Sequence, residues 1–378
     1  MACQPEPRTN HRNALPGARN IVGDPRLNRS ELLFDRPTDL SASAPPEMRG
    51  HDRADVRLMV STQDVDAHYS FTELPGLLEP GDLLVVNESA TLPASLPAAS
   101  RLGNIRLNLS TRFADDSWLA EPRWSPSRPG PLPLKEHEIL EIGNAKALLL
   151  QQYPGIPRLW FVRLDPPADR LMAEYGEPIH YSYAPAYPMS NYQTIFSRFP
   201  GSVEMPSAAR PITEHVRDML RSRGIGIVGI ILHTGVSSLE IEDETVEHQT
   251  LYPEPFRVPE ATANAVNATH ARGGRVIAVG TTVVRALETA WTPSGLRAAS
   301  GATSLYIHPG NEVHAIDGLL TGLHDPITSH LAMLSAIAGL DRVKKAYNEA
   351  IRSRYLWHEF GDSHLLWRQE CSHQEKYC

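Results

Sequence analysis

A glycine followed by two threonines, Gly280-Thr281-Thr282, joins a short, mainly apolar run to a segment with helical periodicity. The run, residues 275–279, carries β-branched side chains and predicts a buried strand. Thr281 and Thr282 offer hydroxyl caps to the helix that follows. The apolar positions of that helix are Val283, Val284, Leu287 and Trp291. A helix that starts where a strand ends presents free backbone N–H groups and favours an anion. An ordinary β–α unit of the core is the alternative interpretation.

Polar side chains also follow two other apolar runs. Residues 83–86 lead into Asn87-Glu88-Ser89, and residues 225–232 end in His233-Thr234-Gly235. In α/β proteins the carboxyl ends of parallel strands share the edge at which ligands bind. His233 is therefore either a structural histidine at a strand end or a functional one at that edge. Glu247-His248 lies in a polar loop further along.

Two other segments have two interpretations each. Residues 177–192, EPIHYSYAPAYPMSNY, contain four tyrosines and are too irregular for a helix. They form either a loop packed over a domain interface or a wall for a flat heterocycle, because aromatic faces stack on bases. The amphipathic segment 341–354 carries five basic residues and is either a solvated face or a basic patch.

Length and composition predict an ordinary globular protein. The 378 residues favour two domains, at about 150 residues per domain. The net charge of −8 means that the chain lacks the overall positive charge typical of nucleic-acid-binding proteins, although a local basic patch would suffice for such binding. No apolar run approaches the roughly 18 residues of a membrane span, and the N-terminus has no signal-peptide pattern. We therefore expect a cytoplasmic protein without a membrane partner.

The sequence predicts no metal site and no disulfide framework. Its three cysteines, Cys3, Cys371 and Cys378, lie in the terminal tails without zinc-site spacing. The 16 histidines show no HExxH motif or similar cluster.

The pattern changes along the chain divide it into parts. Residues 97–169 contain short alternating runs separated by turns, which is typical of a small antiparallel β domain inserted in an α/β body. We expect the α/β domain at 31–96 and 170–366, and loosely attached tails at 1–30 and 367–378. Within the α/β domain we predict helices at 213–223, 260–271 and 327–339, and a strand at 304–307.

Eight stretches, taken together and in order, resemble a known family. They are GDLLVVNES at 81–89, YQT at 192–194, GSVEMPSA at 201–208, LHTG at 232–235, EH at 247–248, GGRVIAVGTTVVRALETA at 273–290, LLTGLHDPITS at 319–329 and FGD at 360–362. The series is similar to that of the S-adenosylmethionine:tRNA ribosyltransferase-isomerases of queuosine biosynthesis.

The resemblance implies an α/β domain with an inserted β-barrel and S-adenosylmethionine as a substrate, without a metal. The family moves the ribosyl part of S-adenosylmethionine onto 7-aminomethyl-7-deazaguanine in tRNA and rearranges it, and adenine and methionine leave. The catalytic candidates are then His233, His324, Glu247, His248 and Arg285. The matched motifs also suggest positions for substrate binding, which are Asn87, Tyr192, Gln193, Thr194, Ser202, Ser207, Gly235, Gly280, Thr281, Thr282, Glu288, Thr321 and Asp362.

Several polar side chains of the family motifs are replaced in this chain. The replaced positions lie at or near Ala90, Ser95, Arg106, Glu121, Pro211 and Leu251. Alanine and serine do not supply the donor fork of an arginine, and proline cannot replace a histidine. This pattern slightly favours a paralogue that uses S-adenosylmethionine on a non-tRNA, small-molecule acceptor in a specialised pathway. The standard tRNA reaction and a non-catalytic binding protein are the alternatives, and the oligomeric state stays open.

Overall fold

The computed structural model describes residues 27–236, 240–241 and 243–369, and strand β3 (Leu83–Asn87) lies at its centre. Leu83 and Val85 pack into the apolar core on one face of the sheet, and Leu84 and Val86 into the core on the other. Successive side chains of a strand point to opposite faces, so a continuous apolar run requires cover on both sides.

This strand belongs to a nine-stranded mixed sheet. Its order is β17-β13-β12-β3-β14-β18-β19-β1-β2. The other strands are β1 (Arg57–Ser61), β2 (Asp66–Ser70), β12 (Gly226–Leu232), β13 (Glu254–Val258), β14 (Val276–Val279), β17 (Ala299–Thr303), β18 (Gly318–Gly322) and β19 (Ser363–Trp367). Strands β12, β3, β14 and β18 run parallel to one another. Their carboxyl ends therefore meet at one edge of the sheet.

Helices cover both faces of this sheet. Apolar side chains of α4 (Glu260–Ala271), α5 (Thr281–Ala290), α6 (Ser329–Ala338) and α7 (Leu340–Arg352) belong to the core on one face. Those of α1 (Leu74–Leu77) and α3 (Glu214–Ser222) belong to the core on the other face. Thr213 caps α3 through the backbone N–H of Val216, as its sequence predicts.

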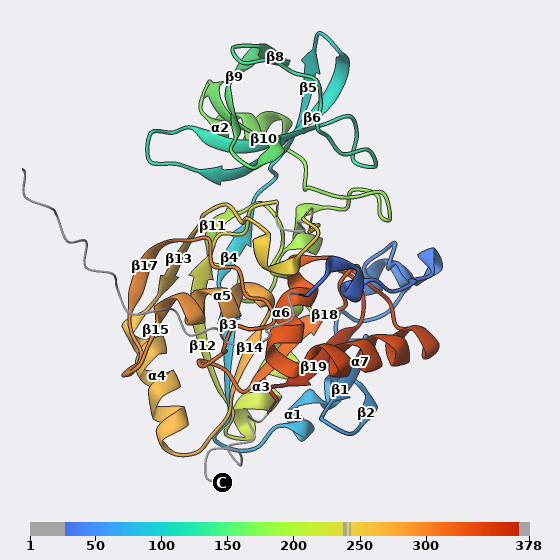
Figure 1. Cartoon of the computed structure of the whole chain (residues 1–378), viewed down its shortest axis with the longest axis vertical. Coiled ribbons are helices and arrows are strands. Elements are labelled where there is room, and N and C mark those ends of the chain that lie inside the picture. Colours follow the sequence, from blue (N-terminus) through green and yellow to red (C-terminus); the bar gives the residue numbers. More distant parts are fainter. Residues whose placement is uncertain (1–26, 237–239, 242, 370–378) are drawn as a thin grey trace, which may run out of the picture.

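A closed six-stranded barrel forms the second lobe, above the carboxyl edge of the sheet in Figure 1. Its strands are β5 (Ser95–Ser100), β6 (Gly103–Arg112), β7 (Trp118–Arg123), β8 (Ile139–Ile142), β9 (Ala145–Tyr153) and β10 (Ile156–Asp165). Helix α2 (Ala168–Tyr175) packs against the barrel core. Two short two-stranded sheets complete the fold, β4 (Ser89–Thr91) with β11 (Phe199–Ser202) and β15 (Trp291–Thr292) with β16 (Gly295–Leu296). The α/β fold with an inserted antiparallel barrel is confirmed.

Two segments of the structure cross the predicted domain boundaries. Ser95 and Leu96, which were assigned to the α/β domain, are the first residues of barrel strand β5. Leu171 and Met172 of α2, also assigned to the α/β domain, belong to the barrel core. The limits of the two domains as units stay a prediction.

Three local predictions are wrong. The N-cap of α5 is Gly280 without any side-chain cap, because Thr281 and Thr282 already lie inside the helix. That helix ends at Ala290, so Trp291 belongs to β15. Residues 304–307 form no strand, because the strand that pairs with β13 comes earlier, at Ala299–Thr303.

The described part of the chain extends into both predicted tails. The backbone N–H of Leu27 donates to Glu247 at 2.8 Å, and Arg29 begins a 3₁₀ turn. Trp367 is the last residue of β19. The three cysteines lie outside the described residues. No helix in the described part of the chain is long and apolar enough to cross a bilayer.

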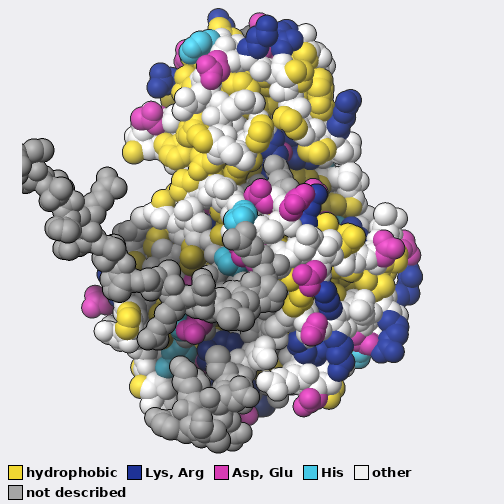
Figure 2. All heavy atoms as spheres, in the orientation of Figure 1, with side chains coloured by type: hydrophobic (Ala, Val, Ile, Leu, Met, Phe, Trp, Pro, Cys, Tyr) yellow, Lys and Arg dark blue, Asp and Glu magenta, His cyan; other side chains and the backbone are white. Residues whose placement is uncertain are grey.

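The basic residues of α7 do not form a continuous patch. Arg342 pairs with Asp66, Lys345 donates to the carbonyl of Asp64, and Arg352 pairs with Glu349. Figure 2 shows acidic side chains interspersed with the basic ones on this part of the surface. This arrangement favours the interpretation of a solvated, charge-balanced face.

Candidate active site

A cleft of about 610 Å³ lies between the barrel and the carboxyl edge of the sheet. Arg123 of β7, Arg158 of β10 and the loop after β7 form its barrel side. Both arginines pair with the carboxylate of Glu121, at 3.1 and 2.8 Å. Glu121 is fully buried, so these ion pairs fix the two guanidinium groups at the cleft.

The floor of the cleft is the turn Gly280–Thr282, where β14 becomes α5. Gly280 has φ +101°, a conformation that side chains with a Cβ rarely adopt. The first N–H groups of a helix have no partner within it, and Gly280 supplies no capping side chain. The floor therefore offers the N–H groups of Thr281 and Thr282 to an anion.

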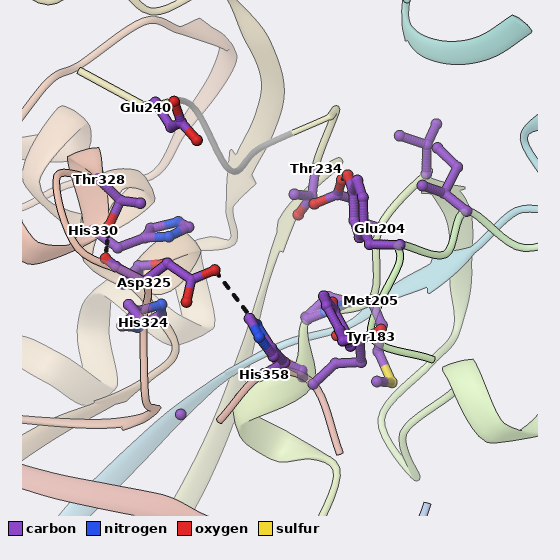
Figure 3. A pocket seen from close by; sticks show the side chains of 18 of the residues that line it. Tyr183, Glu204, Met205, Thr234, Glu240, His324, Asp325, Thr328, His330 and His358 are labelled. Carbon is purple, nitrogen blue, oxygen red and sulfur yellow. Dashed lines mark hydrogen bonds and ion pairs between the residues drawn. The ribbon is translucent and has the colours of Figure 1, made fainter. Parts of the chain in front are cut away.

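A second side, the histidine wall, consists of His324, His330 and His358 (Figure 3). The ring of His324 bonds the Thr321 hydroxyl at 2.8 Å and lies 4.5 Å from the ring of His330. Burial lowers the pKa of His330 and of His358 to about 4. Burial also lowers the pKa of His324 well below its ordinary value. All three rings are therefore neutral near pH 7.

A third side, the tyrosine–glutamate wall, consists of Tyr181, Tyr183, Glu204 and Glu359. The Tyr181 hydroxyl donates to Glu204, and the Tyr183 hydroxyl donates to Glu359. The Tyr183 ring stacks on His358 with centroids 3.8 Å apart and planes inclined by 4°. Burial raises the pKa of both phenols well above the ordinary value, so both keep their protons.

Seven of the residues predicted from the sequence line this cleft. They are Tyr192, Ser207, Gly280, Thr281, Thr282, Thr321 and His324. Tyr192 packs its ring against Phe360, and burial raises its pKa to about 12. The tyrosine-rich segment both lines the cleft and packs against the α/β body, so its two interpretations are not exclusive.

Several predicted residues form a hydrogen-bonded network beside the cleft. Asn87 donates to the carbonyl of Leu232 at 2.8 Å and to the hydroxyl of Thr282 at 3.3 Å. His233 bonds Ser89 at 2.8 Å, and the Ser89 hydroxyl accepts from Ser202 at 2.7 Å. Burial lowers the pKa of His233. The geometry gives this group a structural position. The catalytic role predicted for His233 and the substrate contacts predicted for Asn87 and Ser202 stay predictions.

Arg285 lies below the floor. Its guanidinium pairs with Glu254 and donates to the carbonyls of Leu305 and Thr303, at 3.0 and 3.2 Å. Gly235 donates its N–H to the same Glu254 carboxylate at 2.7 Å. Arg285 is not part of the cleft lining in the described ranges, and it borders a smaller cavity of about 30 Å³, which shares Thr281, Thr282 and His330 with the cleft.

The remaining predicted residues support the fold at other places. Glu247 accepts a hydrogen bond from the backbone N–H of Leu27, and the ring of His248 is hydrogen-bonded to the Thr245 hydroxyl at 2.8 Å. Glu288 accepts from the N–H groups of His314 and Ala315, at 3.0 and 2.7 Å. None of the following lines the cleft within the described ranges: Gln193, Thr194, Glu247, His248, Glu288 and Asp362.

These six side chains are occupied in other contacts. Asp362 pairs with Arg57 at 2.9 Å. The Gln193 side chain accepts from the N–H of Thr91 at 3.0 Å and donates to the carbonyl of Thr91 at 2.8 Å. Thr194 accepts from the N–H of Phe196 at 3.2 Å. Their roles in catalysis or binding therefore stay predictions.

Of the residues that form the two walls, only His324 is among those predicted from the sequence. His330 directly follows a matched motif, and His358-Glu359 directly precedes FGD at 360–362. Proximity to the motifs was the available signal for these residues. Among the described residues, no group of three or more histidine, cysteine or carboxylate side chains is arranged to hold a metal ion.

Comparison with known proteins agrees with the motif series. A family model described as "Queuosine biosynthesis protein" matches residues 29–366. The chain belongs to this queuosine biosynthesis family. Within the family, the S-adenosylmethionine:tRNA ribosyltransferase-isomerase of Moorella thermoacetica is 36% identical over 89% of this chain and 98% of its own. The enzyme of that name from Thermosynechococcus vestitus is 34% identical over 89% of this chain and 95% of its own.

A solved structure shares the fold of this family member. The crystal structure of S-adenosylmethionine tRNA ribosyltransferase from Thermotoga maritima aligns with a TM-score of 0.51 and 29% identity. The alignment covers 89% of this chain and all of that chain. The α/β body and the inserted barrel thus both fall within the shared length.

Proposed function

We propose that this chain transfers the ribosyl part of S-adenosylmethionine to a base in tRNA and isomerises it, releasing adenine and methionine. The observation that carries the proposal is the family match over residues 29–366. Relatives that bear this name cover nearly the whole chain at 33–36% identity. The acceptor that the motifs suggest is 7-aminomethyl-7-deazaguanine, and the product carries an epoxycyclopentanediol.

The substrate's own sulfonium carries much of this chemistry. The positive sulfur makes C5′ electrophilic and its protons acidic, and methionine leaves as a neutral thioether. The protein has to orient the two substrates, remove a C5′ proton and hold the ribose and the departing adenine. The cleft has to supply a base and polar contacts.

His324 is our candidate for the base. Burial lowers its pKa well below the ordinary value, so the ring is unprotonated near pH 7 and does not repel the sulfonium. The hydrogen bond to Thr321 at 2.8 Å fixes the orientation of the ring. His330, at 4.5 Å, is also neutral and adds no opposing charge.

The floor suits the carboxylate of the methionine part. Helix N-termini favour an anion over a neutral group, because unpaired N–H groups and the helix dipole act together. Thr281 and Thr282 supply the N–H groups. Gly280, at positive φ, has no Cβ that would obstruct the approach of the carboxylate. Ribose hydroxyls are the less favoured occupants because they are uncharged.

The comparisons favour tRNA over the small-molecule acceptor that the replaced motif residues suggested. Within the described ranges, none of Ala90, Ser95, Arg106, Glu121 and Pro211 lines the cleft. Leu251 lines only the smaller cavity. Of the six replaced positions, Glu121 bears on the cleft indirectly, because its carboxylate pairs with Arg123 and Arg158 at the barrel side. No feature of the cleft supports a specialised pathway or a non-catalytic role.

The test is an assay with purified protein, S-adenosylmethionine and tRNA bearing the 7-aminomethyl base. We expect adenine and methionine in equal amounts, together with a new nucleoside in the tRNA digest. Parallel reactions with unmodified tRNA and with the free base should release no adenine above background. Acceptor-independent release, or release driven by the free base, would overturn the tRNA assignment.

A further inference from the structure

A loop of the barrel, residues 124–131, follows β7 and lies along the barrel side of the cleft. Five of its residues line the cleft, namely Pro126, Ser127, Pro129, Gly130 and Pro131. The chemistry above uses no residue of this loop. Its two largest side chains, Trp124 and Arg128, lie next to the lining residues in the sequence. A ligand that extends out of the cleft on the barrel side would therefore meet this loop.

Short contacts hold the loop in a defined shape. The backbones of Ser125 and Arg128 exchange two hydrogen bonds, of 3.3 and 3.1 Å. Arg123 donates to the carbonyl of Pro126 at 3.2 Å, and Leu132, just after the loop, is buried in the barrel core. The loop is thus anchored at both ends, which lowers the entropy cost of binding a ligand there.

The guanidinium of Arg128 lies over the ring of Trp124, 5.0 Å from its centroid. Trp124 is half-buried and packs against the barrel core, whereas Arg128 is exposed. Among the described residues, Arg128 has no carboxylate partner. Stacking on an aromatic face orients a guanidinium and leaves the N–H donors in its plane available. An oriented, unpaired fork of donors matches the oxygens of a phosphate group.

The charge of the chain also favours an anion on this side of the cleft. Residues 95–175, which contain the barrel and α2, carry ten Lys and Arg and nine Asp and Glu, whereas the whole chain carries 36 and 44. The negative charge is thus concentrated outside the barrel, so a polyanion is repelled least at the barrel. Arg123 and Arg158 already pair with Glu121, which leaves Arg128 as an unpaired cation beside the cleft.

We propose that Arg128, positioned by Trp124, binds a phosphate of the tRNA backbone next to the nucleotide whose base enters the cleft. The inference rests on the proposed function, because it requires RNA as the second substrate. A base that enters a cleft keeps its flanking nucleotides at the edge of that cleft, where enzymes of this kind contact them. Arg128 donates to the phosphate oxygens, and Trp124 is a positioning residue. A protein with a net charge of −8 thereby gains a local contact for RNA.

The salt dependence of tRNA binding tests the contact of Arg128. The probe is tRNA bearing the 7-aminomethyl base, with the dissociation constant measured by filter binding at several salt concentrations. Arg128→Gln should weaken binding roughly fivefold or more at about 150 mM salt and lower the slope of log Kd against log salt by about 0.7. Arg128→Lys keeps the charge but not the planar fork, so it should keep the slope and still bind more weakly than wild type.

Arg163→Gln is the matched control. Arg163 is an exposed arginine of β10 that forms no ion pair in the described ranges and does not line the cleft. We expect this variant to keep both the affinity and the slope of the wild type. Equal losses in Arg163→Gln and Arg128→Gln would overturn the proposal, because they would indicate diffuse attraction of RNA to the whole barrel.

A double-mutant cycle tests the positioning role of Trp124. Trp124→Leu should weaken tRNA binding by at least threefold in the wild-type background and by less than twofold in Arg128→Gln, because its effect depends on the guanidinium. Trp124→Phe keeps an aromatic face and should restore most of the affinity. Equal losses in both backgrounds would remove Trp124 from the contact and assign it to the barrel core alone.

Two further outcomes separate this inference from the proposed function. If the wild type releases adenine with this tRNA and Arg128→Gln binds it with the affinity and slope of the wild type, the phosphate contact is overturned while the proposed function stands. If the wild type binds neither S-adenosylmethionine nor tRNA, the proposed function fails and this inference fails with it.

Discussion

The floor and the tyrosine–glutamate wall of the cleft offer opposite charges by different means. The floor uses backbone N–H groups at the start of α5, whereas the wall uses the side chains of Glu204 and Glu359. Binding by backbone N–H groups persists through most side-chain substitutions but is lost when the backbone conformation changes. A site made of carboxylates responds to a single isosteric change. The cleft is thus polarised, which suits a substrate that carries both a carboxylate and cationic groups.

The histidine wall lines the same cleft as these two regions, and loss of its candidate base should have the largest effect on turnover. We expect His324→Gln to lower kcat by at least 100-fold, because general base catalysis contributes roughly 10²–10⁴-fold. His215→Ala, on the exposed surface of α3, is the control and should retain wild-type kcat. Adenine release under saturating substrates measures both. A kcat within threefold of wild type in His324→Gln would remove His324 from the chemistry.

Variants of Arg285 test whether its ion pair below the floor stabilises the fold or whether Arg285 takes part in turnover. Arg285→Met leaves Glu254 buried without its partner, which costs about 3–5 kcal/mol of unfolding free energy. The double variant Arg285→Met/Glu254→Gln should recover most of that loss, as measured by chemical denaturation. Reduced turnover at full stability would instead restore the catalytic role that the sequence suggested for Arg285.

The floor itself should be sensitive to its glycine. Gly280→Ala strains a residue at φ +101° and puts a Cβ 3.4 Å from that of Ala208. We expect at least tenfold weaker binding of S-adenosylmethionine, or about 1.4 kcal/mol. Gly273→Ala, also at positive φ but with nothing within 4 Å of its Cβ, should lose stability without losing affinity. Equal affinity losses in the two variants would indicate a general effect of backbone strain.

The smallest expected effect is on the pH dependence of thermal stability, through Glu359 of the tyrosine–glutamate wall. The pKa of Glu359 is raised in the folded state, so its ionisation destabilises the fold as pH rises above the unfolded-state value of about 4.3. Glu359→Gln should therefore unfold at a slightly higher temperature than wild type at pH 8. This difference should disappear near pH 4. A variant that is less stable at pH 8, or a difference independent of pH, would contradict the burial of an uncompensated carboxylate.

The sequence predicted the floor and, of the walls, only His324 and the tyrosine-rich segment 177–192 as one of two interpretations. The determinants of the floor are local in sequence, whereas those of the walls are not. A strand, a glycine and a helix in succession define the Gly280–Thr282 turn locally. The tyrosine–glutamate wall assembles from Tyr181, Tyr183, Glu204 and Glu359, which come from three distant segments that only the tertiary fold brings together.

The strands also differ in how far the local sequence specifies them. Apolar runs such as 83–86 were recognisable, whereas β17, with the sequence ASGAT, has almost no hydrophobic signal and is specified by its pairing with β13. Arg285 and Asp362, suggested by the motifs as a catalytic and a substrate-binding residue, form ion pairs with Glu254 and Arg57 that the sequence did not indicate. The six replaced motif positions do not line the cleft within the described ranges, although Glu121 holds two arginines that do. Sequence alone shows neither arrangement.

A crystal structure of His324→Gln with S-adenosylmethionine would test the central claim most directly. We predict that the ligand occupies the cleft between the barrel and the sheet edge, with its carboxylate bonded to the N–H groups of Thr281 and Thr282. Its C5′ should lie next to the side chain at position 324. A ligand outside this cleft, or a carboxylate turned away from the floor, would contradict the account.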